Sequence, residues 1–133
     1  QALPPGGVML LHTIVRPSDD EATERQLKLT MNLLRFVKFI MEEIFPGGDL
    51  PHVAVVEKHA IRGGFEVARV QSLRSHYART LEIWAAALEA RKPEAVAIQS
   101  EEVYQRYLKY LTGCADLFRN GYTDICQFTL VKP

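Results

Sequence analysis

The length of 133 residues predicts a single domain, and the 47% hydrophobic and 24% charged content is ordinary for a globular protein. Sixteen Lys and Arg balance sixteen Asp and Glu. A formal charge of zero argues against nucleic-acid binding, which needs clustered cations. No apolar run approaches the roughly 20 residues needed to cross a bilayer, so no integral membrane segment is predicted.

The first residues lack the basic cluster and apolar core of a secretory signal. Because the chain does not begin with Met, Gln1 is interpreted as a cut boundary. Cys114 and Cys126 are too few for a disulfide scaffold, and a reduced, cytoplasmic setting is expected.

Residues 8–15 follow a Pro-Gly turn and are apolar except for His12 and Thr13. Such a run predicts a strand covered on both faces, as in a mostly parallel sheet. His12 lies toward the carboxyl end of this strand, and ligand crevices in open α/β sheets lie outside that end. His12 is therefore a candidate site residue.

Residues 19–28 are mostly polar and charged and are interpreted as a loop or frayed turn. The strongest helix is predicted over residues 30–44, with Thr30 as its N-cap. Its polar stripe is narrow, so the wide apolar surface should be covered by protein or by a hydrophobic ligand.

The remaining elements follow from breakers and periodicity. They are a helix at 52–62, a strand at 65–70, a helix at 77–91, a stretch resuming at 94, a Ser100-capped helix at 101–119 and a strand at 124–131. This order indicates an α/β fold with three strands. The first strand is too apolar for a free edge, which suggests that a neighbouring strand is absent upstream.

Four separated blocks together resemble the cyclopropane fatty acid synthase family. The blocks are LLHTI at 10–14, IFPGGDLP at 44–51, SLRSHYARTL at 72–81, and YLTGCADLFR at 110–119 continuing to YTDICQFTL at 122–130. The last block is most similar to the mycolic acid cyclopropane synthase branch. The resemblance covers nearly the whole chain, and four blocks in the right order are far more specific than any one.

Family members are S-adenosylmethionine-dependent methyltransferases of the Rossmann-like type. The resemblance implies that residues 1–133 are the C-terminal portion of one methyltransferase domain. Its strands would be the fifth, sixth and seventh of seven, with the last running antiparallel between the other two. The cofactor-binding N-terminal half would be absent, and no G-x-G-x-x-G pattern is present.

The resemblance also implies the chemistry. A methyl group moves from the sulfonium to the cis double bond of a long acyl chain, and the carbocation loses a proton as the ring closes. The base is a bound bicarbonate, held by His12, the backbone amide of Ile14 and the hydroxyl of Tyr77. Convergent neutral donors suit a small oxyanion in a water-poor pocket.

Family members enclose the acyl chain in an apolar tunnel. The matching candidates for substrate binding are Phe45, Leu50, Leu81, Tyr110 and Cys114. Aromatic rings there could stabilise a cation through their π-faces. An alternative interpretation of each of these residues, and of His12 and Tyr77, is a side chain of the hydrophobic core. The other histidines lack ligand-like spacing, so no metal site is predicted.

Three functions remain open. The first is a fragment of a cyclopropane-forming methyltransferase, inactive by itself because it lacks most of the cofactor site. The second is a non-catalytic lipid-binding or interaction module built on the same half-fold. The third is a methyltransferase that makes oxygenated or plain methyl products. In each case the unpaired first strand predicts a homo-oligomer or a strand-exchanged dimer.

Overall fold

The computed structural model describes residues 3–133, so the interpretation of Gln1 lies outside the described residues. The chain forms two compact units. We call the first the sheet unit, which contains the described residues through 27 together with Asp49–Arg74 and Gly121–Pro133. We call the second the helical unit, which contains Lys28–Gly48 and Ser75–Asn120.

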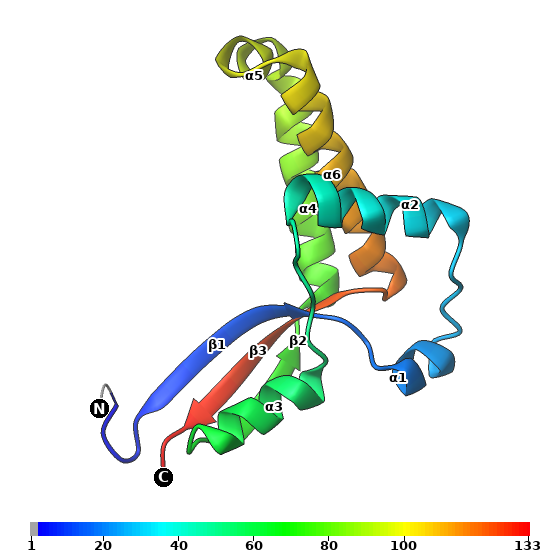
Figure 1. Cartoon of the computed structure of the whole chain (residues 1–133). Coiled ribbons are helices and arrows are strands. Elements are labelled where there is room, and N and C mark those ends of the chain that lie inside the picture. The colour runs from blue at the N-terminus through cyan, green and yellow to red at the C-terminus, as the bar shows by residue number, and fades with distance from the viewer. Residues whose placement is uncertain (1–2) are drawn as a thin grey trace. The chain divides into compact units, whose positions relative to one another are not determined.

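The sheet unit contains three strands, β1 (Val8–Val15), β2 (Glu66–Ser72) and β3 (Asp124–Val131). Their order is β1-β3-β2, and β3 runs antiparallel to both neighbours (Figure 1). The predicted α/β class and the central antiparallel position of the last strand are confirmed.

Helix α3 (Val53–Arg62) covers one face of this sheet. The small side chain of Ala60 packs there against Val15, Phe128 and Leu130, which are at most 1% exposed. Successive residues of a strand point to opposite faces, so α3 covers the odd-numbered residues of β1.

The expectation that β1 is covered on both faces is wrong. Val8 and Leu10 are each 59% exposed, and His12 is also exposed. The physical reason is that α3 covers only one face, and among the described residues β1 has β3 as its single neighbouring strand.

The prediction of a loop or frayed turn over residues 19–28 is also wrong in its first part, because α1 (Asp19–Glu24) is a capped helix. The Ser18 hydroxyl accepts a hydrogen bond from the Glu21 amide, and the Glu21 carboxylate accepts one from the Ser18 amide. This reciprocal pair satisfies two amides that a helix start leaves open.

The helical unit contains α2 (Met31–Phe39), the π-helix η1 (Ile40–Ile44), nearly all of α4 (Arg74–Ala90), α5 (Lys92–Ile98) and α6 (Glu101–Asn120). Thr30 caps α2 as predicted, since its hydroxyl accepts from the Leu33 amide at 3.1 Å. Ser100 caps α6 in the same way. Helix α5 starts at Lys92, because Pro93 fits the first turn of a helix.

Within the helical unit, α4 and α6 pack together (Figure 1). Their shared core includes Ala78, Leu81, Leu111, Ala115 and Phe118. Over residues 3–133, no helix has both the length and the apolar character needed to cross a membrane.

Candidate functional site

His12 lies on the face of the sheet opposite α3. It pairs in register with Gln127 of β3, and Gln127 pairs with Gln71 of β2. Paired residues point to the same face of a sheet, so a histidine and two glutamines form a polar row across it. The sequence interpretation missed both glutamines, although Gln127, flanked in β3 by the apolar Cys126 and Phe128, was an available signal.

The backbone amide of Ile14 points toward the open edge of β1. Lys132 donates its amide to the Gly7 carbonyl at one end of the sheet, and Leu73 donates to the Ile125 carbonyl at the other. Along an antiparallel ladder, residues that exchange hydrogen bonds with the neighbouring strand alternate with residues that do not. The first bond makes the odd-numbered residues of β1 the ones that bond to β3, and the second agrees, because it directs the odd-numbered residues of β3 toward β2. The even-numbered residues of β1 therefore direct their amides away from β3, and the Ile14 amide is free to donate a hydrogen bond to a ligand at that edge.

Leu50 lies in a segment that is held against the end of β1. The Arg16 side chain donates to the Leu50 carbonyl at 3.0 Å, and the Arg16 amide donates to the Pro51 carbonyl at 3.1 Å. The Leu50 side chain is half-buried. Its position follows from the path of the chain after β1 and before α3.

Tyr77 lies near the start of α4 in the helical unit. Its ring meets that of Phe118 edge-on at a centroid distance of 4.9 Å and that of Trp84 at 6.4 Å. Burial, followed by the proximity of Cys114, raises the pKa of the Tyr77 phenol. Its hydroxyl is therefore a neutral hydrogen-bond donor at neutral pH.

Tyr110 and Cys114, one turn apart on α6, complete a cluster with Tyr77. Burial raises the pKa of the Cys114 thiol to about 12. The pKa of the Tyr110 phenol is raised to about 12, mainly by burial and further by the proximity of Cys114 and Tyr77. The Phe45 ring lies 6.0 Å from the Tyr110 ring in an edge-on contact. We call Phe45, Tyr77, Tyr110 and Cys114 the aromatic cluster.

Leu81, one turn after Tyr77, is 1% exposed and belongs to the packed interior of α4 and α6. The structure thus places Tyr77 in the helical unit together with four of the substrate candidates, which are Phe45, Leu81, Tyr110 and Cys114. His12, Ile14 and Leu50 belong to the sheet unit. The convergence of His12, the Ile14 amide and Tyr77 on one ion stays a prediction.

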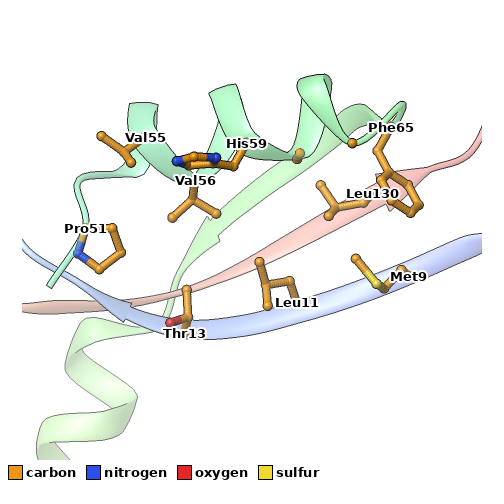
Figure 2. Close-up of a pocket in the computed structure, with 11 residues that line it drawn as sticks. Met9, Leu11, Thr13, Pro51, Val55, Val56, His59, Phe65 and Leu130 are labelled. Carbon is orange, nitrogen blue, oxygen red and sulfur yellow. The ribbon is translucent and has the colours of Figure 1, made fainter. Parts of the chain in front are cut away.

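An apolar groove between β1 and α3 was not predicted from the sequence. It has a volume of about 390 Å³, and Figure 2 shows side chains of both elements turned toward it. Its lining includes Met9 and Leu11 from β1, Val55 and Val56 from α3, and Phe65. The signal that could have found it is the odd-numbered apolar set of β1 facing the apolar side of α3.

The described strands offer no glycine-rich turn into a helix. β1 leads to α1 through residues 16–18, and β2 leads to α4 through Leu73, none of which is glycine. Gly47 and Gly64 follow helical segments and have φ values of 72° and 82°, as helix-ending glycines do. Within residues 3–133, no three His, Cys, Asp or Glu side chains gather as a metal site requires.

The comparisons with known proteins agree on one family. The family model described as "Mycolic acid cyclopropane synthetase" matches residues 1–128. Cyclopropane mycolic acid synthase 3 of Mycobacterium tuberculosis is 61% identical over 132 residues, which are 99% of this chain and 46% of that protein.

Solved structures give the same result. That of the cyclopropane synthase MmaA2 from Mycobacterium tuberculosis has a TM-score of 0.94 and 58% identity, covering 98% of this chain and 46% of that one. Mycolic acid cyclopropane synthase CmaA1 complexed with SAH and CTAB has a TM-score of 0.88 and 57% identity, with the same coverage. The chain spans about half the length of these relatives, and it belongs to the mycolic acid cyclopropane synthetase family.

Proposed function

We propose that this chain is the C-terminal portion of an S-adenosylmethionine-dependent methyltransferase domain that adds a methylene or methyl group to the double bond of a long acyl chain. The observation that carries the proposal is the 61% identity with cyclopropane mycolic acid synthase 3 along 99% of the chain. The chain spans 46% of that relative, so the activity belongs to a longer protein or to an assembly.

We assign S-adenosylmethionine mainly to the part of the relatives that this chain does not span. The described turns after β1 and β2 lack the glycines of a cofactor loop, so these residues do not fit that cofactor by themselves. The complex of CmaA1 with SAH supports the cofactor for the whole enzyme. The chain alone is expected to transfer no methyl group.

His12, the Ile14 amide and the Tyr77 hydroxyl would hold a bicarbonate ion. The exposed His12, the outward direction of the Ile14 amide and the raised pKa of the Tyr77 phenol all suit hydrogen-bond donation to an oxyanion. A bicarbonate bound there would supply the base for the proton lost in ring closure. The residues themselves would orient that ion and lower its cost of desolvation.

The aromatic cluster, with Leu50 and Leu81, would line the path of the acyl chain. Burial keeps Tyr110 and Cys114 neutral, and neutral side chains do not oppose an apolar ligand or repel a carbocation. The rings of Phe45 and Tyr110 could face the developing positive charge. The complex of CmaA1 with CTAB supports a long-chain ligand.

The protein is proposed to work in the cytoplasm, where its two free cysteines would stay reduced. It would take an acyl lipid and no nucleic acid. The open edge of β1 would let the isolated chain pair with a second copy. The alternative of a non-catalytic lipid-binding module is not supported better than the methyltransferase, because the relatives that match the whole chain are synthases.

A hybrid enzyme tests the proposal. It joins this 133-residue chain to the preceding half of cyclopropane mycolic acid synthase 3, and its lipid products are followed by mass spectrometry. His12→Ala and Tyr77→Phe should each lower kcat by roughly 100-fold, the usual cost of one oxyanion donor. His59→Gln, an exposed histidine of α3, is the matched control. Full activity of His12→Ala would refute the assignment of that residue.

A further inference from the structure

The rotation of helix α2 about its own axis is fixed by its contacts with α6. The ring of Phe36 lies directly on Gly113, where an added Cβ would come within 2.2 Å of the ring. Phe39 is buried, and the Lys109 ammonium lies 4.0 Å from its ring centroid. These two phenylalanines therefore determine which side of α2 faces α6 and which side faces away.

The side that faces away is apolar. Met31, Leu34, Val37 and Met41 recur every three or four residues and so share one face of the helix. They are 64%, 47%, 38% and 46% exposed. We call these four residues the outer stripe. At about 1.5 Å per residue, it runs for roughly 15 Å along the helix.

Two cations of α2 lie on or beside the outer stripe. Arg35, four residues after Met31, lies at its margin, and Lys38, four residues after Leu34 and three before Met41, lies within it. Residues 28–41 contain three cations and no acidic residue, and Glu42 and Glu43 follow. Glu42 lies 3.7 Å from Lys38, so these two charges partly neutralise each other, and Glu43 lies 3.2 Å from Arg106.

We propose that α2 docks in the plane of a lipid surface carrying anionic headgroups. The outer stripe would enter the acyl boundary while Arg35 and Lys38 reach back to the headgroups. Flexible Met and Leu side chains suit a fluid apolar layer, which needs no complementary hollow on a partner. This inference rests on exposed side chains and charges and does not depend on the proposed catalysis.

Vesicle binding of the 133-residue chain tests the proposal. Vesicles of phosphatidylcholine containing about one third phosphatidylglycerol should bind the chain, and added salt should weaken binding. Replacing Leu34 and Met41 with Ser should weaken binding by about 100-fold, since each loses its apolar burial. Replacing Arg35 and Lys38 with Gln should weaken binding to these vesicles and leave binding to pure phosphatidylcholine unchanged.

Two controls keep the test decisive. Ile98→Ser removes an apolar side chain that is 77% exposed on α5, outside the stripe, and should leave binding unchanged. Leu34→Met with Met41→Leu keeps the stripe apolar and should bind as the unaltered chain does. Circular dichroism checks that each variant folds. No vesicle binding by the unaltered chain, or equal binding by the serine variant, would overturn the proposal, as would binding to an acidic protein only.

Discussion

Thr123, just before β3, has a hydroxyl whose solvation is lost on folding. The residue is 9% exposed, and among the described residues its Oγ1 finds no hydrogen-bond partner. A buried polar group without a partner costs free energy relative to an apolar group of the same shape.

Thr123→Val should therefore raise the free energy of unfolding, by about 1 kcal/mol. Urea unfolding followed by circular dichroism measures the change. Thr112→Val, on the exposed side of α6, serves as a comparison that lacks this gain. A loss of stability in Thr123→Val would mean that the hydroxyl has a partner.

The thiol of Cys114 gives a pH prediction. Its pKa rises from a usual 9.0 to about 12 because of burial. Between these values the unfolded chain loses the proton and the folded chain keeps it, so the free energy of unfolding should fall as pH rises. Below pH 9.0 both states keep the proton, and this group contributes no pH dependence.

The pH dependence of thiol alkylation in a Cys126→Ala variant isolates Cys114, because it follows the thiolate and not the five tyrosines. The folded variant should ionise near pH 12, and the same variant in urea should ionise near its usual value. Ionisation near pH 9.0 in the folded state would contradict the buried position of the thiol.

At the scale of single residues, the family resemblance named candidates that composition could not. His12 and Tyr77 were both plausible as core side chains, and His12 instead lies exposed on the sheet. The polar row through Gln127 escaped prediction because it depends on strand register. Register is set by pairing between segments more than 50 residues apart in the sequence.

At the scale of elements, Gly113 controls how closely α2 approaches α6. Gly113→Ala should destabilise the chain by about 1–3 kcal/mol, because a Cβ would overlap the Phe36 ring. This loss of stability should appear even though alanine has a higher helix propensity than glycine.

A double-mutant cycle supplies the control. With Phe36→Ala in place, Gly113→Ala should no longer destabilise and should become neutral or slightly stabilising. Equal losses in both backgrounds would show that the ring does not rest on Gly113.

Local signals predicted most elements, including the two caps and the full span of β3. The predictions of elements failed where one local signal outweighed another. The charge run after Ser18 hid a Ser-x-x-Glu capping box. The stretch predicted to resume at residue 94 begins two residues earlier, because Pro93 fits a first helical turn. The apolar character of β1 predicted cover that α3 provides on one face only.

At the scale of the whole molecule, the open edge of β1 governs association. The edge exposes outward-pointing amides and apolar side chains, and β1 carries no Lys, Asp, Glu or Pro to block pairing. β2, the other outer strand, has Glu66, Arg69 and a register shift before Arg69.

The isolated chain should therefore form a dimer or larger species through β1 at tens of micromolar. Leu10→Lys should shift it toward monomer, because a charge at the edge opposes pairing. Leu29→Lys, at an exposed position outside the sheet, should not. Light scattering coupled to size exclusion measures both, and a monomeric unaltered chain would contradict this expectation.

The methyl donor is proposed to bind mainly outside this chain. Isothermal titration of S-adenosylmethionine into the chain alone, and into the hybrid with the preceding half of cyclopropane mycolic acid synthase 3, measures where it binds. We expect no detectable heat of binding with the chain alone and clear binding with the hybrid. Micromolar binding by the 133-residue chain alone would contradict this assignment.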